Sequence, residues 1–242
     1  LLSLQLRGEG PMHLMLVECT DGLAMRAVAR FRDVPDSRDL RVLSGNGTLT
    51  VTVESGNAAH RYQGIVPLAG ASMSDSLRAY FEHSEQLPTR LWLRADADSA
   101  SGLLLQRLPV TARPQGVTES GAGGVTDEEI EDAWRRVQLV ADTVTADELA
   151  RLEDRELLRR LFAEDDVRMF QSAPVFFRCR CSRERVSTML RSLGREEVDS
   201  VLEEFGQVEV RCEFCSRSYR YDVVDATALF AAGADAHRGG LH

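Results

Sequence analysis

The chain has 242 residues, of which 43% are hydrophobic and 28% are charged, and its formal net charge is −9. This composition fits a globular chain with a buried core and excludes a disordered protein or a long coiled coil. No apolar run approaches the ~18 residues of a membrane-spanning helix, and the first six residues do not resemble a signal peptide. We therefore expect a cytoplasmic protein without a membrane partner. The negative charge also disfavours nucleic acid, because a phosphate backbone attracts basic surfaces.

Residues 1–112 alternate apolar and polar side chains in short runs bounded by turn residues. The segments Leu2–Leu6, Thr48–Val53 and Arg90–Arg94 show the period of two that is typical of antiparallel strands. Ser74–Glu85 has helical spacing instead. We predict a sheet domain with at least one covering helix. Because the chain opens inside a strand pattern without an initiator Met, we also expect the natural protein to have a segment before the first residue.

Residues 113–173 hold most of the net negative charge, with 8 arginines against 15 acidic residues. Pro114 and the glycines of 113–124 indicate a connecting segment. Thr126 and Thr145 are each followed three residues later by Glu, a capping-box pattern that predicts the starts of two helices. Short helices are unstable alone in water, so their apolar stripes need a surface to dock on. These stripes include Ile130, Trp134, Val137, Leu152, Leu158 and Phe162.

Residues 174–242 predict a small domain with two short helices and a hairpin. The helices end at Gly194 and Gly206, and Val208–Val210 and Tyr219–Tyr221 form the predicted hairpin. So small a domain, with so little apolar content, requires additional stabilisation by a metal or disulfides. The predicted fold is therefore α+β in three parts. A sheet-rich core domain spans 1–112, an acidic helical linker spans 113–173, and a small C-terminal domain with four cysteines spans 174–242.

The four cysteines of this last domain, Cys179, Cys181, Cys212 and Cys215, form two closely spaced pairs. Four thiolates in two such pairs are typical of tetrahedral zinc, so we predict a zinc-binding domain. The first pair is separated by only one residue, which gives two sulfurs an immediate oxidation partner. Arginines flank both pairs. They favour thiolate over thiol, or else they form an ordinary solvated basic face.

Two other functions fit the same cysteines. One is a zinc-ribbon interaction module whose metal is purely structural, in which case the bound zinc would resist peroxide. The other is a thiol oxidoreductase using Cys212 and Cys215, although the βαβ context of such enzymes is missing. Cys19 has the pattern of a buried small hydrophobe. We find no constellation of residues typical of an enzyme active site and predict a protein without catalytic activity.

The chain resembles the heat-shock protein 33 family of redox-regulated chaperones. The last domain carries the resemblance in Phe177–Arg185, in Glu196–Leu202 and in the final cysteine pair. The family's leading helical segment has no counterpart at the start of this sequence. Further matches along the chain are Gly8–Met12, Met25–Arg30, Gly45–Gly47, Arg61–Gly64 and Ser84–Arg90.

The resemblance implies a cytoplasmic, nucleotide-independent holdase for unfolding proteins. Its reduced, zinc-bound form would be inactive. Oxidation would pair Cys179 with Cys181 and Cys212 with Cys215, release zinc and destabilise the linker helices, and the oxidised form would be able to form a homodimer. Spacing alone leaves all three connectivities of four cysteines open, so this pairing comes from the family. The exposed linker stripes, or the core surface that they cover, would then bind clients.

Overall fold

The computed structural model describes residues 1–54, 61–109 and 126–234. These residues form two compact units, one of Leu1–Leu23 with Ala29–Pro174 and one of Ala24–Val28 with Val175–His242. The predicted connecting segment 113–124 lies outside the described residues, and the division into three parts remains a prediction. Among the described residues, no helix combines the length and hydropathy needed to cross a bilayer.

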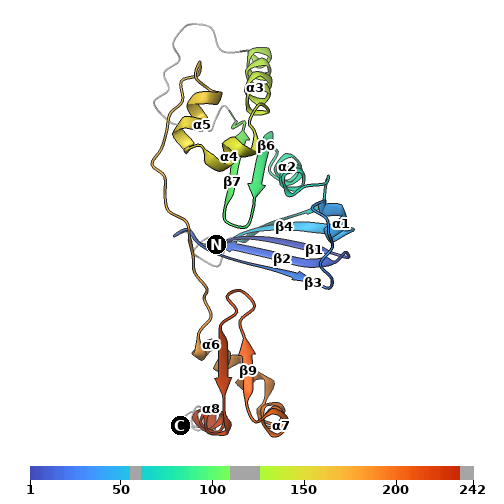
Figure 1. Ribbon diagram of the computed structural model, residues 1–242, viewed down its shortest axis with the longest axis vertical. Helices are drawn as coiled ribbons and strands as arrows, with labels where there is room; N and C mark the ends of the chain where they lie inside the picture. Colours follow the sequence, from blue (N-terminus) through green and yellow to red (C-terminus); the bar gives the residue numbers. More distant parts are fainter. Residues whose placement is uncertain (55–60, 110–125, 235–242) are drawn as a thin grey trace, which may run out of the picture. The chain divides into compact units, whose positions relative to one another are not determined.

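An antiparallel sheet is the base of the first unit, with its strands in the order β5-β4-β1-β2 (Figure 1). It confirms the strands predicted at 2–6 and 48–53. The strands are β1 (Leu2–Gly8), β2 (Met12–Cys19), β4 (Gly47–Glu54) and β5 (Arg61–Pro67). The strand β3 (Ala24–Phe31) begins in the second unit, where its first two residues pair in parallel with β8 (Phe176–Phe177).

The predicted covering helix is α2 (Met73–His83), which packs on one face of this sheet. Leu49 and Val51 are two residues apart on β4 and are both buried, as the alternating pattern requires. With Val66 of β5 and Tyr80 of α2, they form one apolar cluster. The sheet domain therefore has its own core, independent of the cysteines.

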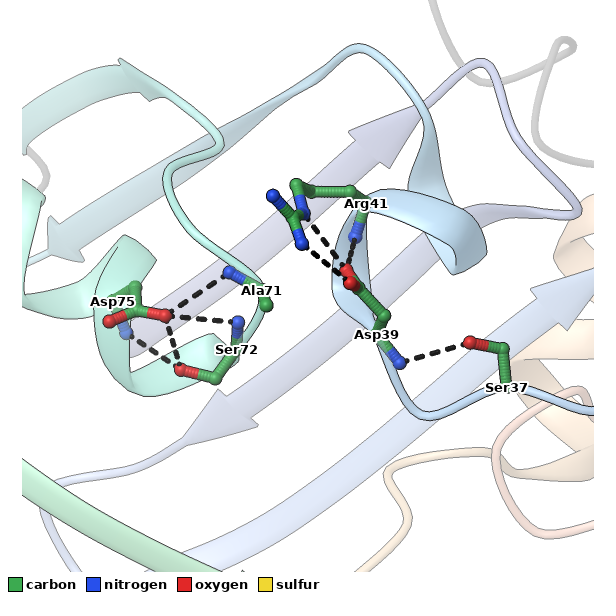
Figure 2. Close-up of polar contacts among 6 residues, drawn as sticks. All are labelled: Ser37, Asp39, Arg41, Ala71, Ser72 and Asp75. Carbon is green, nitrogen blue, oxygen red and sulfur yellow. Dashed lines mark hydrogen bonds and ion pairs between the residues drawn. The ribbon is translucent and has the colours of Figure 1, made fainter.

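Side-chain caps fix the starts of the short helix α1 (Leu40–Ser44) and of α2 (Figure 2). The Asp39 carboxylate accepts a hydrogen bond of 2.9 Å from the backbone N–H of Arg41. At α2, the Ser72 hydroxyl accepts from the Asp75 N–H at 3.1 Å, and the Asp75 carboxylate accepts from the Ser72 N–H at 3.2 Å. This reciprocal capping box satisfies two backbone donors that the helix cannot satisfy itself.

Replacing the N-cap residue, Ser72→Ala, is expected to destabilise the first unit by ~1 kcal/mol at neutral pH. The hydroxyl of Ser72 is the main cause that lowers the pKa of Asp75. Because the pKa of Asp75 is lower in the folded than in the unfolded protein, its ionised carboxylate stabilises the fold at pH values above the unfolded pKa. This stabilisation is lost as the pH falls through the folded pKa. The difference in urea midpoint between wild type and variant should therefore shrink in acid. Ser74→Ala, on the same turn but not at the N-cap, is the control and should change the midpoint little.

A second hairpin of the first unit carries the linker helices. It consists of β6 (Thr89–Ala95) and β7 (Ala100–Gln106), and it confirms the strand predicted at 90–94. Figure 1 shows the helices α3, α4 and α5 beside this hairpin. Their bounds are Asp127–Ala141, Ala146–Arg151 and Asp154–Leu161.

The sequence predicted two linker helices, and residues 126–173, the described part of the linker, contain three. The capping boxes at Thr126 and Thr145 are both present, so the two predicted starts are confirmed. The second helix, however, ends at Arg151, because Leu152 adopts an extended conformation, and a new helix begins at Asp154. Arg151 lies in the last turn of α4, and Asp154 and Glu156 lie in the first turn of α5. A basic residue at a helix end and acidic residues at a helix start both complement the helix dipole.

The second unit confirms the two glycine-terminated helices and the hairpin. The helix α6 (Arg183–Leu193) ends at Gly194, and α7 (Arg195–Phe205) ends at Gly206, which has a left-handed φ of 75°. A final helix is present for which the sequence analysis made no prediction. The remaining elements are β9 (Val208–Arg211), β10 (Ser218–Tyr221) and this helix, α8 (Val223–Ala234). The small core of this unit includes Val186, Leu190, Val198, Leu202, Tyr219 and Tyr221.

Candidate metal centre

The four predicted ligands come from two loops of the second unit. Cys179 and Cys181 lie in the segment between β8 and α6, and Cys212 and Cys215 lie in the turn that joins β9 to β10. Two backbone hydrogen bonds close this turn, from the Cys212 N–H to the Arg217 carbonyl at 2.9 Å and from the Ser216 N–H to the Cys212 carbonyl at 2.8 Å. The hairpin thereby directs both sulfurs of the second pair toward the first pair.

The sulfur atoms of the four cysteines form one cluster in which all lie within 4.8 Å of one another. The Sγ atoms of Cys179 and Cys212 are 3.6 Å apart, and those of Cys181 and Cys215 are 3.4 Å apart. A tetrahedral ion with bonds of ~2.3 Å to sulfur separates its sulfur ligands by ~3.8 Å. This separation lies between the 3.4 Å of the Cys181–Cys215 pair and the 4.8 Å limit of the cluster. The four cysteines could therefore hold a metal ion. The residues fit zinc in number, type and spacing.

The electrostatics of the cluster also favour a cation. The Arg217 backbone N–H donates to Cys215 and lowers its pKa, but hydrogen bonding with Cys181, burial and the other two cysteines outweigh this and raise the pKa to about 12. The thiolate form of Cys215 is thus disfavoured by its surroundings when no cation compensates the charge. A bound divalent ion reverses this balance, because it stabilises every thiolate that it contacts.

Tyr219 and Arg217 interact with the sulfurs from outside the four-cysteine cluster. The Tyr219 hydroxyl donates a hydrogen bond to the Sγ of Cys181 at 3.1 Å. Arg217 interacts electrostatically with Tyr219, which raises the pKa of the Arg217 guanidinium. Cys181 and Cys212 also pack against the apolar core that contains Tyr219. The cysteines are therefore continuous with the core of their unit.

Several of the flanking arginines have structural partners. Arg183 forms an ion pair of 2.8 Å with Asp225, and its guanidinium carbon lies 4.4 Å from the centroid of the Tyr221 ring. Arg220 pairs with Glu209 at 3.5 Å. Arg217, which follows the second cysteine pair, interacts mainly with Tyr219 and then with Cys181 and Cys215, and all three raise its pKa.

Comparison with known proteins identifies the family. The family model described as Hsp33 protein matches residues 1–222. Proteins named 33 kDa chaperonin are 40% identical over 229 residues in Methylobacillus flagellatus and 44% identical over 230 residues in Nitrosococcus oceani, covering 95% of this chain and 73% of each relative. The chain belongs to the Hsp33 family. This confirms the resemblance in the sequence and supports a chaperone role.

The fold agrees with this family assignment. A crystal structure of a 33 kDa chaperonin from Thermotoga maritima matches with a TM-score of 0.77, covering 97% of this chain and 78% of that chain at 21% identity. The α+β architecture, with an N-terminal sheet, helices and a C-terminal cysteine cluster, is therefore that of an Hsp33 protein. The relatives carry the names of chaperonins, not of enzymes.

The structure brings together four of the six linker residues proposed as a client or docking surface in this Hsp33 protein. Phe162 is buried in an apolar cluster with Ala141, Leu149, Leu157 and Leu161. Val137, Leu152 and Leu158 are partly buried against that cluster. Ile130 and Trp134 are half-buried on α3 and do not belong to it.

The sequence analysis missed the other side of this cluster. Trp92 of β6 and Leu103 and Leu105 of β7 pack against the linker helices. Trp92 and Leu103 are register partners, so the three side chains share one face of the hairpin. The alternating pattern of Arg90–Arg94 could have indicated this face of the hairpin, because it places Trp92 on the side of the strand opposite Leu91 and Leu93. Tyr219 was treated only as a strand residue.

Polar contacts hold the helix α3 to the same hairpin. The Arg90 Nε donates to the Gln138 side-chain oxygen at 2.7 Å, and Arg107 forms an ion pair with Glu131. Within α4 and α5, Arg160 pairs with Glu148. The linker helices are thus docked by an apolar cluster with a polar rim.

A groove with a volume of about 1090 Å³ follows α5 and the segment after it. Leu158, Phe162, Val167 and Met169 provide its apolar lining, between charged side chains of both signs. Two of the proposed client residues therefore already border an open surface.

Cys19 lies on β2 and is not part of the four-cysteine cluster. Its thiol donates a hydrogen bond of 3.4 Å to the Thr20 carbonyl, and its side chain is half-buried rather than fully buried as its sequence pattern suggested.

Proposed function

We propose that this Hsp33 protein is a redox-regulated, nucleotide-independent holdase that binds unfolding proteins under oxidative stress. The zinc-bound, reduced form is inactive. Oxidation forms disulfides, releases the zinc and exposes apolar surface. The observation that carries this proposal is the cluster of four sulfurs within 4.8 Å, in a chain whose linker helices cover an apolar face. The protein works in the cytoplasm, because a tetrathiolate site persists only where thiols stay reduced.

Zinc is the metal ion that we propose is bound by Cys179, Cys181, Cys212 and Cys215. When bound, it stabilises four thiolates and ties two loops of the second unit together. The β9–β10 turn orients Cys212 and Cys215, and the apolar core behind Cys181 and Cys212 limits the access of water to the site. Binding free energy at such a site is largely folding free energy.

Oxidation by hydrogen peroxide supplies the proposed switch. A thiolate sulfur attacks a peroxide oxygen, an S–O bond forms, the O–O bond breaks and hydroxide leaves. A second thiolate attacks that sulfur, an S–S bond forms, the S–O bond breaks and hydroxide leaves again. Each disulfide thus transfers two electrons from two sulfurs to one peroxide. Disulfide sulfurs are poor ligands, so the metal dissociates.

The proposed pairing, Cys179 with Cys181 and Cys212 with Cys215, follows the family. In the reduced structure, the sulfurs of a different combination also lie close together, with Cys179 3.6 Å from Cys212 and Cys181 3.4 Å from Cys215. Because all four sulfurs are within 4.8 Å, the neighbouring pairs are also within reach once the metal has left. Peptide mapping of the oxidised protein distinguishes the three possible combinations.

Loss of the metal is proposed to free the linker helices through the chain that joins them to the second unit. After α5, the segment leads to β8, whose two residues pair with the start of β3. While this pairing persists, both ends of the segment are held and undocking gains little conformational entropy. When the second unit unfolds, one end is released and the undocked state becomes more favourable. The six-residue α4 and eight-residue α5 cannot remain helical alone.

The exposed surface is proposed to consist of Trp92, Leu103 and Leu105 on the hairpin and of the linker stripes that covered them. These stripes include Ile130, Trp134, Val137, Leu152, Leu158 and Phe162. Apolar patches of several hundred Å² are typical of protein-binding surfaces. The acidic residues of the linker keep the opened form soluble. Unfolded or partly unfolded proteins are the proposed partners, and a homodimer is proposed for the oxidised form.

A client aggregation assay with zinc-loaded protein tests this function. Peroxide at a mildly denaturing temperature should release zinc and switch on suppression of aggregation together, and a thiol reductant should prevent both. Equal suppression by reduced and oxidised protein would contradict the redox switch. Zinc that stays bound in peroxide would favour the alternative, an interaction module with a purely structural metal.

A further inference from the structure

Tyr219 is the side chain that links the core of the second unit to the proposed redox switch. Its hydroxyl donates to the Sγ of Cys181 at 3.1 Å, and the residue is only 7% exposed. Water cannot readily replace the donor at such a position. A thiolate at Cys181 therefore shares one lone pair with a fixed O–H group, independent of solvent.

The hydroxyl is also polarised from the other side. The positively charged Arg217 interacts electrostatically with Tyr219, and a cation near a phenol strengthens the hydrogen bond that its O–H group donates. Cys215 receives a different donor, the backbone N–H of Arg217, which no side-chain substitution removes. Cys181 thus has a hydrogen-bond donor that a side-chain substitution can remove.

We propose that Tyr219 is a positioning residue that restrains oxidation of Cys181 and so sets how readily the cluster releases its metal. This inference rests on the proposed function and adds the residue that tunes it. The hydrogen bond withdraws electron density from the sulfur and holds the sulfur in one position. Both effects oppose its attack on a peroxide oxygen, in which the sulfur gives up an electron pair, an S–O bond forms and hydroxide leaves.

The variant Tyr219→Phe tests the proposal on the zinc-loaded 242-residue chain. Zinc release by hydrogen peroxide should be faster by about fivefold, the rate factor that corresponds to one ordinary hydrogen bond. Trapping with an alkylating reagent and peptide mapping should assign the increase to Cys181. An unchanged rate, or an increase shared equally by all four cysteines, would overturn the proposal.

Tyr221→Phe is the matched control, because Tyr221 is on the same strand and is 2% exposed. Its hydroxyl donates to the Arg183 carbonyl at 3.0 Å and lies 3.0 Å from the Ser187 hydroxyl, so this variant removes buried hydrogen bonds that do not involve sulfur. It should leave the rate of zinc release unchanged. If both variants accelerate release equally, Tyr219 acts only through stability and the proposal is wrong.

Replacing zinc by cobalt(II) gives a spectroscopic measurement that should not change if Tyr219 only stabilises the fold. Removing the donor makes the sulfur more electron-rich, so the thiolate-to-cobalt charge-transfer band of Tyr219→Phe should shift to longer wavelength, and that of Tyr221→Phe should not. Should Tyr219→Phe fail to load metal, a ring-fluorinated tyrosine at position 219 keeps the side-chain size and strengthens donation. It should slow zinc release, and faster release would contradict the proposal. Wild type that never releases zinc would instead refute the proposed function.

Discussion

Removing the metal from the reduced protein should unfold the second unit while the sheet of the first unit stays folded. The core of the second unit is small, and Cys181 and Cys212 pack directly against it. A structural zinc site contributes ~10–16 kcal/mol of apparent folding free energy, which equals or exceeds the total stability of a typical domain. The sheet core around Leu49 and Val51 contains none of the four cysteines and should not respond.

Titration with a zinc chelator, followed by circular dichroism and by NMR signals of individual residues, measures this effect. Signals of α6, α7 and α8 should collapse as the metal leaves, whereas those of β1 and β4 should persist. Cys212→Ser, which removes one proposed ligand, should mimic the chelator. Cys19→Ser is the control and should behave as wild type, because Cys19 is not in the cluster. A second unit that stays fully folded without metal would refute the stabilising role of zinc.

Leu161→Ala should produce a chaperone that is active without oxidation. Leu161 ends α5 and is 6% exposed within the cluster that docks the linker helices. Truncating a buried leucine costs ~2–5 kcal/mol, because apolar contacts are lost and a cavity remains. The short helices α4 and α5 are unstable when they are not docked, so a loss of this size should favour the undocked state.

The two tryptophans of the chain report this undocking, since Trp92 packs against the cluster and Trp134 lies on α3. The reduced, zinc-loaded variant should show red-shifted fluorescence and should suppress client aggregation without peroxide. Val66→Ala, which creates a cavity in the sheet core instead, should lower stability without constitutive activity. If reduced Leu161→Ala protein is as inactive as wild type, the docked helices do not mask the client surface.

The parts of the fold that depend on local patterns were predictable from the sequence. The capping residues Thr126 and Thr145 marked helix starts, Gly194 and Gly206 marked helix ends, and alternation marked β1, β4 and β6. Such signals act within a few residues of chain, so the sequence contains them directly. The four-cysteine spacing likewise predicted a cluster that the structure brings together.

Features that depend on tertiary contacts were not predictable in the same way. The break at Leu152, after which α5 places Leu157 and Leu161 in the cluster, is marked by no glycine or proline. The hairpin face with Trp92 looked like any other strand face until its partner was known. The hydrogen bond from Tyr219 to Cys181 joins residues 38 positions apart, and this pair, unlike the four cysteines, belongs to no spacing motif.

Hydrogen exchange measured by mass spectrometry, before and after peroxide treatment of the zinc-loaded protein, tests the central claim most directly. The account predicts that amides of α6, α7 and α8 and amides of α3, α4 and α5 lose protection in step with zinc release, while β1 and β4 remain protected. Linker helices that keep full protection after all zinc has left would contradict it, because the metal would then not control the surface that these helices cover.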